Sequence, residues 1–332
     1  MAQFDLPLDR LRIYAPTVEE PEDFDAFWSA TLADQDALPL DVTVTAVRNG
    51  LALINTFNVT YAGFGGATVH AWLHVPAGSR HPLPLVVEYT GYASGRGLPF
   101  QNTLFAQAGY AHLIMDNRGQ GEWAIGDTED PASGGVIGGY MTRGILDPRS
   151  FYYRRLFVDA VRAVQAARTL ALVDADRIVV AGASQGGGIA LAVSVLAPGL
   201  RGAIVDIPFL CHFERALTMT DRPPYREVVD YLARYRDRAD AVLRTLSYVD
   251  GVNFAARSDV DALYSVALMD TTCPPSTVYA AFNAHAGPKE MVVYPYNDHE
   301  GGAEAQTWRR LEWLAERFGP PIDRVESSWG LQ

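Results

Sequence analysis

Cysteine is scarce in this sequence of 332 residues, which contains only two thiols, Cys211 and Cys273. Two cysteines are too few for a disulfide framework or for a four-thiolate zinc site. They could pair with each other, but free thiols are expected in a reducing compartment. The cysteine content therefore argues against a small secreted domain held together by disulfides.

Long apolar runs and excess positive charge are also lacking. No apolar stretch reaches the roughly 18 residues that a transmembrane helix needs. The first residues show no basic segment followed by an apolar run, so we expect no secretory signal peptide. The formal net charge of −12 repels nucleic acid phosphates and anionic lipids. These absences predict a cytoplasmic protein that binds neither nucleic acid nor membrane.

What the sequence does contain is ordinary globular material, with 48% hydrophobic and 20% charged residues. Short apolar runs alternate along it with helical patterns, in which apolar residues lie three and four apart. The runs are nearly continuous in aliphatic residues, as expected of strands buried on both faces of a sheet. They lie at 83–90, 111–116, 177–182, 202–207, 263–270 and 289–295.

Alternating strands and helices pair in parallel through crossover connections, so the sequence predicts an α/β fold with a mostly parallel central sheet. The clearest helical patterns span 152–170, 189–197 and 307–318. Two earlier stretches, 42–47 and 52–75, alternate with a period nearer two and predict antiparallel strands in the same sheet.

One segment breaks this alternation. Residues 209–258 contain polar helical sequence and no strand pattern, although they lie between two core strands. An insertion there would sit above the strand ends, where open α/β sheets bind ligands. We therefore expect one domain over 1–332, with a helical cap insertion at about 209–258.

The motif G-x-S-x-G is present as Gly182-Ala183-Ser184-Gln185-Gly186, with a strand pattern before it and a helical pattern after it. This context is typical of a nucleophile elbow, a tight turn that holds a serine hydroxyl forward. The turn could instead only pack, or bind phosphate as dinucleotide folds do. A dinucleotide fold would carry G-x-G-x-x-G near the N-terminus, and that pattern is absent.

A serine nucleophile needs a base, and the base needs an acid that orients it. In folds with this elbow the chain order is serine, acid, histidine. His299 follows the last strand pattern and is the predicted base, whereas His285 lies in a helical pattern and is expected to pack. Asp270 ends a strand pattern and is favoured as the acid over Asp206, one strand earlier.

Two backbone N–H groups must stabilise the oxyanion that forms during attack on a carbonyl. One belongs to the residue after the nucleophile, Gln185. The other comes from the loop 90–97, where Gly91, Tyr92 and Ala93 are candidates. Asp298, beside the predicted base, is expected to be a solvated loop residue.

At this point the residues resemble a known family, the acetyl xylan esterases and cephalosporin C deacetylases of carbohydrate esterase family seven. Stretches around Asp270 and Tyr152 are similar to that family as well, and the likeness covers nearly the whole chain. The three family signatures stand here as Arg118-Gly119-Gln120, the stretch 182–187, and His299-Glu300.

The resemblance implies an α/β-hydrolase fold with a triad of Ser184, Asp270 and His299. It also implies that the N–H groups of Tyr92 and Gln185 form the oxyanion hole. No metal or organic cofactor is expected. The implied substrates are small acetylated sugars and cephalosporin C, and the implied assembly is a homohexamer.

Several residues could serve either structure or function. Arg118 is expected to tether its loop by bonding backbone carbonyls, and Glu300 to anchor its own loop. The aromatic rings of Tyr92, Phe209, Phe213 and Trp123 could wall a substrate pocket or simply pack the cap. Two other functions stay open: a peptidase or lipase acting on other acyl groups, and a hydrolase fold that only binds.

Overall fold

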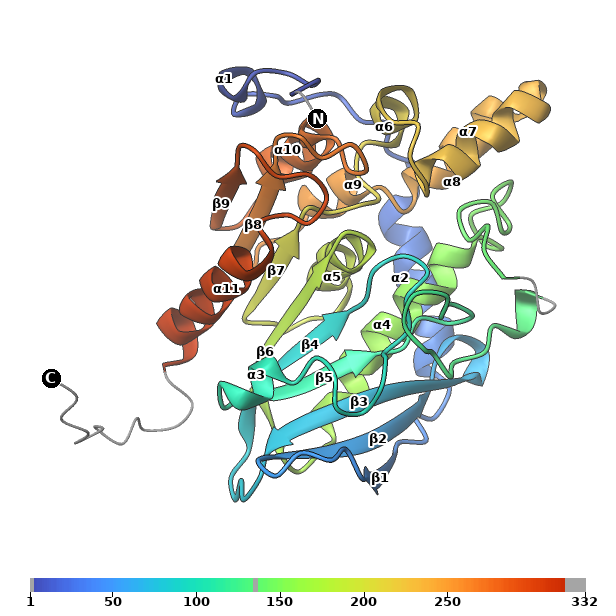
Figure 1. Ribbon diagram of the computed structural model, residues 1–332. Coiled ribbons are helices and arrows are strands. Elements are labelled where there is room, and N and C mark those ends of the chain that lie inside the picture. The colour runs from blue at the N-terminus through green and yellow to red at the C-terminus, as the bar shows by residue number, and fades with distance from the viewer. Residues whose placement is uncertain (1–2, 134–136, 320–332) are drawn as a thin grey trace, which may run out of the picture.

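A single mixed sheet of nine strands organises the protein (Figure 1), seen in a computed structural model that describes residues 3–133 and 137–319. The strand order is β1-β2-β3-β5-β4-β6-β7-β8-β9. The strands are β1 (Thr43–Val47), β2 (Ile54–Ala62), β3 (Thr68–Pro76), β4 (Leu83–Tyr89), β5 (Ala111–Met115), β6 (Val173–Ala183), β7 (Gly202–Asp206), β8 (Ala262–Ala267) and β9 (Lys289–Tyr294).

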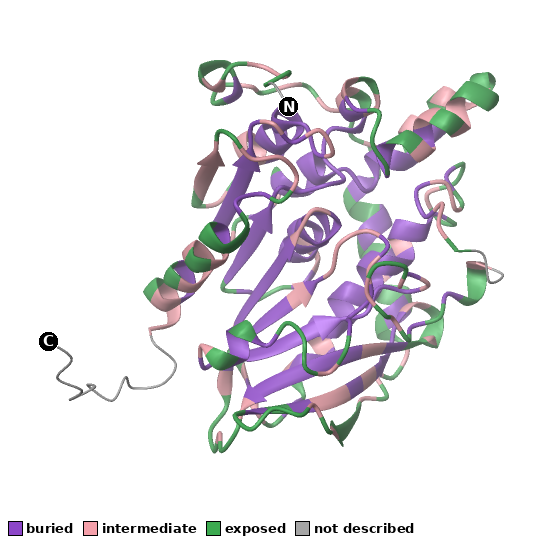
Figure 2. Ribbon diagram, viewed as in Figure 1, coloured by how far each residue is buried: buried purple, intermediate pink, exposed green. Residues whose placement is uncertain are grey.

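The sheet divides into an antiparallel and a parallel part. β1, β2, β3 and β5 pair in antiparallel fashion, whereas every pair from β5 through β4 to β9 is parallel. Both parts match the sequence patterns that predicted them. Every residue of β5, β7 and β8 is buried (Figure 2), which explains why these strands read as continuous apolar runs.

Helices cover both faces of the sheet, and alternate residues of one strand enter different cores. Leu85 and Val87 of β4 join the larger core with α4 and α5, while Val86 between them packs toward α3 and α11. The predicted α/β fold with flanking helices is confirmed. The helices are α1 (Leu8–Leu11), α2 (Phe24–Asp36), α3 (Leu104–Gln107), α4 (Tyr152–Arg168), α5 (Gln185–Leu196), α6 (Phe213–Met219), α7 (Tyr225–Arg234), α8 (Ala239–Ser247), α9 (Gly251–Ala255), α10 (Pro275–Ala284) and α11 (Ala303–Phe318), with single 3-10 turns at Phe64–Gly66, Pro131–Ser133 and Arg236–Arg238.

The segment between β7 and β8 is helical, as its sequence indicates. It forms α6, α7, α8 and α9. α9 contacts α5 and α10 and so belongs to the body of the protein. α7 and α8 project away from the sheet at the upper right of Figure 1. The role of α6 to α8 as a cap over a pocket stays a prediction.

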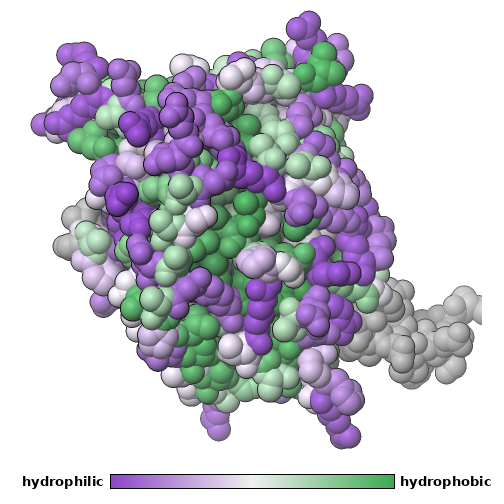
Figure 3. All heavy atoms as spheres, turned by 180° about the vertical axis from the view of Figure 1, so that it is seen from behind, coloured by the Kyte–Doolittle hydropathy of each residue, from purple (hydrophilic) through white to green (hydrophobic). Residues whose placement is uncertain are grey.

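The surface mixes polar and apolar groups. On the side opposite to Figure 1, apolar side chains gather near the middle, with hydrophilic ones around them (Figure 3). Within the described residues, no helix combines the length and the apolar content needed to cross a bilayer.

Candidate active site

Ser184 lies in the turn between β6 and α5, with φ 55° and ψ −120°. A positive φ is unfavourable for any residue with a Cβ, so the turn needs neighbours that allow it. A Cβ on Gly186 would lie 2.0 Å from the Tyr89 carbonyl oxygen, and one on Gly182 would lie 2.3 Å from the Gly186 carbonyl carbon. The two glycines of the motif therefore let helix and strand meet closely enough to present the hydroxyl.

Ser184, His299 and Asp270 are joined in one hydrogen-bonded line. His299 Nε2 lies 3.0 Å from Ser184 Oγ, and His299 Nδ1 lies 2.9 Å from Asp270 Oδ2. The side chain of Asp270 is 1% exposed and that of His299 is 32% exposed. A buried carboxylate that holds a partly open imidazole against a serine is the arrangement that base-activated nucleophiles require.

The acid is itself held by the loop that follows β8. Asp270 Oδ1 accepts hydrogen bonds from the backbone N–H groups of Thr272 (2.8 Å) and Cys273 (2.9 Å). Asp298 accepts the Thr271 N–H at 3.0 Å, which ties the acid's loop to the histidine's loop. Asp298 is a partly exposed loop residue, as expected, and its carboxylate also bonds the neighbouring loop.

The alternative acid and base lie elsewhere. Asp206 is 2% exposed and its carboxylate is bound by Gln306 and Arg310 of α11. His285 is buried and its Nε2 donates to the Val260 carbonyl at 2.9 Å. Both side chains have structural partners, and neither bonds Ser184.

The loop after β4 is clamped onto the elbow by two glutamine side chains. Gln185 Nε2 donates to the carbonyls of Thr90 (3.3 Å) and Gly91 (3.2 Å). Gln120 Oε1 accepts the Ala93 N–H at 2.7 Å, and the two amides lie 3.1 Å apart. Because its N–H is already bonded, Ala93 is excluded as an oxyanion donor.

The Tyr92 and Gln185 N–H groups stay available at this junction, as does the Gly91 N–H among the described residues. Among the residues that the structure describes, neither the Tyr92 N–H nor the Gln185 N–H has a hydrogen-bond acceptor. Gln185 is also the first residue of α5, where the helix dipole adds positive potential. The arrangement can therefore receive an oxygen that gains negative charge.

Sequence reasoning missed three side chains that brace this junction. Asn117 Nδ2 donates to Thr90 Oγ1 at 2.7 Å and to other acceptors of the same loop. Tyr153 donates to Gln185 Oε1 at 2.9 Å, and Tyr152 accepts from Gln120 Nε2 at 2.9 Å. Asn117 directly precedes the Arg-Gly-Gln signature and Tyr152 lies in a family-like stretch. These positions are the only features of the sequence that point to the bracing side chains.

Arg118 and Glu300 have different surroundings. The Arg118 guanidinium pairs through two nitrogens with the Asp159 carboxylate, with Nη2 2.7 Å from Oδ1. Asp130 lies 3.6 Å from the same group. Arg118 was expected to bond backbone carbonyls, but its guanidinium bonds carboxylates instead, because the planar fork of arginine matches the two oxygens of a carboxylate. Glu300 is exposed and accepts from the Asn297 amide at 2.8 Å.

The four aromatic residues named as pocket candidates do not form one wall. The ring of Tyr92 lies edge-on to Phe209 at 6.4 Å. Phe209 and Phe213 are buried, and both pack against Tyr225. Trp123 is 83% exposed, and its side chain stands apart from the other three. The structure thus brings Tyr92 to Phe209 but leaves Trp123 on the surface.

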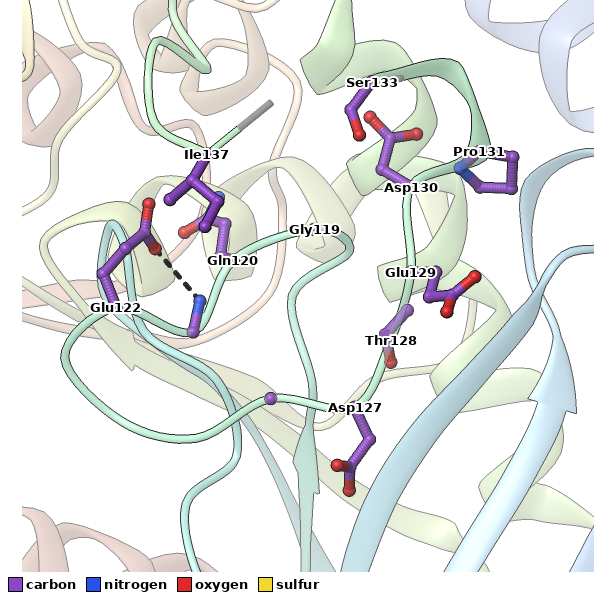
Figure 4. Close-up of a pocket in the computed structure, with 12 residues that line it drawn as sticks. Gly119, Gln120, Glu122, Asp127, Thr128, Glu129, Asp130, Pro131, Ser133 and Ile137 are labelled. Carbon is purple, nitrogen blue, oxygen red and sulfur yellow. Dashed lines mark hydrogen bonds between the residues drawn. The ribbon is translucent and has the colours of Figure 1, made fainter. Parts of the chain in front are cut away.

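A cavity of about 640 Å³ lies beside the Gln120 loop (Figure 4). Glu122 is one of the lining residues and accepts the Gly121 N–H at 3.0 Å. Ser184, Asp270 and His299 are not among the described residues that line this cavity. Its walls are 119–122, 126–131, Ser133 and Ile137.

The triad region also contains the donor atoms that a metal ion could use. Ligand atoms of Asp270, Cys273 and His299 all lie within 4.8 Å of one another. Asp270 and His299 already bond each other through their facing atoms. Cys273 is buried, which raises the pKa of its thiol. The Asp270 and His299 atoms that face each other are therefore already used by the hydrogen bond of the triad.

Comparison with known proteins decides the family. The family model described as acetyl xylan esterase (AXE1) matches residues 1–317. The chain belongs to the acetyl xylan esterase family. It is accordingly a carboxylic ester hydrolase with the α/β-hydrolase fold.

Members of the acetyl xylan esterase family are also found among solved structures and curated relatives. An acetyl xylan esterase from Paenibacillus sp. R4 is 40% identical, with a TM-score of 0.86 over 93% of this chain and 99% of that one. Acetyl xylan esterase 1 from Thermoanaerobacterium sp. JW/SL YS485 is 31% identical, with a TM-score of 0.85 over 94% and 99%. Acetyl esterase Axe7A of Xylanibacter ruminicola is 24% identical over 91% of this chain and 68% of its own.

Proposed function

We propose that this family member removes O-acetyl groups from small acetylated carbohydrates through an acetyl-serine on Ser184. The observation that carries the proposal is the pair of distances around His299, 3.0 Å to Ser184 Oγ and 2.9 Å to Asp270 Oδ2. The names of the relatives, acetyl xylan esterase and acetyl esterase, support the acetyl group as the acyl part. Cephalosporin C belongs to the proposed substrates by the same family likeness.

In the first half-reaction, His299 Nε2 takes the Ser184 proton as the hydroxyl oxygen bonds the acetyl carbonyl carbon. The carbonyl oxygen becomes an oxyanion, which the N–H groups of Tyr92 and Gln185 stabilise. Asp270 holds the imidazole in the tautomer that accepts this proton and stabilises the imidazolium. The C–O bond to the sugar then breaks, and His299 returns the proton to the leaving alkoxide.

In the second half-reaction a water molecule takes the place of the sugar hydroxyl. His299 accepts a proton from this water as its oxygen attacks the acetyl-serine carbonyl. The same two N–H groups stabilise the second oxyanion. Acetate leaves when the bond to Ser184 Oγ breaks and the serine regains its proton. Each step uses side chains and backbone that lie at this site.

The first test is hydrolysis of nitrophenyl acetate by Ser184→Ala and His299→Ala. Both changes should lower kcat by about 10³-fold or more, because the nucleophile and its base act as a unit. His81→Ala is the matched control, since His81 is exposed, and it should keep the wild-type kcat. A fluorophosphonate probe should label Ser184 stoichiometrically, and labelling at another residue would refute the assignment.

A second test concerns the acyl group. If the enzyme is a deacetylase, kcat/KM should be highest for acetate esters and fall with acyl length. Acetylated xylo-oligosaccharides, monosaccharide acetates and cephalosporin C should be compared under the same conditions. Faster hydrolysis of octanoate esters would instead support a lipase.

A further inference from the structure

The hydroxyl of Tyr92 contacts the inserted helices rather than an open pocket. It donates to Glu227 Oε1 of α7 at 2.5 Å and accepts the Tyr140 N–H at 3.1 Å. The second carboxylate oxygen of Glu227 accepts the Met141 N–H at 3.2 Å. The phenol thus already has both a donor and an acceptor partner, and Glu227 uses both of its oxygens.

The surroundings of this contact are mostly buried. Tyr140 and Met141 are fully buried, and the Tyr92 ring lies edge-on to Tyr140 at 5.4 Å. Burial raises the pKa of Tyr92 and that of Glu227 above their ordinary values. Glu227 is half-buried, and a carboxyl group withdrawn from water without hydrogen bonds would be costly. The bonds from Tyr92 and Met141 therefore keep Glu227 in this place.

The backbone of Tyr92 is fixed on either side as well. The Gly91 carbonyl before it accepts from Gln185, and the Ala93 N–H after it is held by Gln120. The N–H of Tyr92 has no acceptor among the described residues. The Tyr92 N–H shares one planar peptide group with the Gly91 carbonyl, so Gln185 holds that group from the backbone side. The tyrosine side chain, which ends on Glu227, holds the same residue from the other side.

We propose that Glu227 is a positioning residue for acyl transfer: through the Tyr92 hydroxyl it holds the Tyr92 N–H where the oxyanion forms. α7, a helix of the insertion between β7 and β8, thereby takes part in stabilising the transition state. This inference rests on the proposed function, because it assigns the second oxyanion donor to Tyr92. It adds a requirement that neither the triad nor the family signatures contain.

The proposal predicts a specific kinetic change for Tyr92→Phe, which removes one oxygen atom and keeps the ring. Loss of an oxyanion donor lowers turnover by about 10²–10³-fold, and here the donor is displaced rather than removed. We expect kcat for nitrophenyl acetate to fall about tenfold with KM nearly unchanged. A trifluoromethyl ketone, whose adduct with Ser184 places an oxyanion in the same position, should bind more weakly by a similar factor.

Glu227→Ala should reproduce this effect, and Glu227→Gln should give a smaller one. The amide has one acceptor oxygen, so it can serve Tyr92 or Met141 but not both in the way that a carboxylate does. The double variant Tyr92→Phe with Glu227→Ala should be no slower than either single variant, because both remove the same bond. If Glu227→Ala fails to fold, the other two single variants still decide the question.

Asp230→Ala is the matched control on the same helix. The Asp230 side chain is 61% exposed and pairs with Arg226 at 2.7 Å on the surface. This variant should keep kcat and the affinity for the trifluoromethyl ketone. Circular dichroism and thermal melts of every variant show whether the fold is intact.

Two outcomes overturn the inference. One is wild-type kcat and ketone affinity in folded Tyr92→Phe and Glu227→Ala. The other is multiplicative loss in the double variant, which would mean that the two residues act separately. Ser184→Ala in the same assay tests the proposed function on its own. If that variant is inactive while the Tyr92 and Glu227 variants are unaffected, only the role of Glu227 fails.

Discussion

At the scale of single residues, the backbone of Ser184 is bonded on both sides although its φ is positive. Its N–H donates to the Asp206 carbonyl at 3.0 Å, and its carbonyl accepts from Gly188 (3.1 Å) and Phe209 (2.9 Å). A strained residue costs about 1–3 kcal/mol and persists only where its surroundings fix it. Bonds to β7, α5 and the start of the insertion provide that fixation.

Arg118 leads to a prediction about stability. Arg118 and Asp159 are both nearly fully buried, at 2% and 0% exposed. Arg118→Met leaves the Asp159 carboxylate buried without its charged partner, which typically costs about 3–5 kcal/mol. Urea denaturation should show a loss of unfolding free energy of this size.

Two comparisons make the Arg118 result decisive. Arg177→Ala removes a half-exposed pair with Asp174, and such surface pairs contribute only about 0–1 kcal/mol. Adding Asp159→Asn to Arg118→Met should recover part of the lost stability, because the buried charge is then gone. A loss below about 1 kcal/mol for Arg118→Met would contradict the structural role.

The sequence predicts the triad residues more completely than the residues that brace them. Ser184, Asp270 and His299 each follow a strand, and the carboxyl ends of parallel strands meet at one edge of a sheet. Glu227 and Tyr92 are 135 residues apart, and Glu227 lies on a helix with no strand to fix its position. Their contact depends on how α7 packs, which a single sequence does not encode locally.

At the scale of elements, the antiparallel pair β3 and β5 places two histidines opposite each other. His74 and His112 are register partners, and both are buried. Burial, with a smaller effect of His112, lowers the pKa of His74 to about 3. His112 Nε2 lies 2.9 Å from Glu88 Oε2. The imidazole of His74 is therefore uncharged in the folded sheet at neutral pH, whereas in acid the unfolded chain binds a proton there.

His74 makes stability depend on pH in a defined direction. Its pKa in the unfolded chain is about 6.5, so between pH 6.5 and about 3 the unfolded state binds more protons than the folded state. The titration of His74 therefore does not change the free energy of unfolding above pH 6.5. As the pH falls from 6.5 toward 3, it lowers the free energy of unfolding by up to about 1.4 kcal/mol per pH unit. Urea unfolding of His74→Gln between pH 7 and 4 should show a shallower decline than the wild type, and equal declines would contradict this assignment.

Elements with strong periodicity were predicted well, and short ones were not. The six parallel-sheet runs became strands because burial on both faces requires continuous apolar sequence. β8 ends at Ala267, before the predicted limit of 270, because the chain turns there to place Asp270. The helices α6 to α9 were expected only as one helical segment. Their lengths of five to ten residues give too few turns for clear separation.

At the scale of the whole molecule, the family resemblance predicts a homohexamer. Large apolar side chains such as Leu53 and Trp123 are 79% and 83% exposed, and a subunit interface would cover surface of this kind. Light scattering after size exclusion should give six times the chain mass. Because each chain carries a net charge of −12, low ionic strength should favour dissociation on dilution. A chain-mass particle at every salt concentration would contradict the prediction.

The bond between Tyr92 and Glu227 also limits how freely this scaffold could be re-engineered. A chimera that receives the α6 to α8 segment of another esterase, in order to change its substrate range, would carry a foreign side chain at the position that Tyr92 meets. Unless donor and recipient supply a matching phenol and carboxylate, such a graft would retain its nucleophile yet work slowly. Successful transplants should therefore move the two positions together.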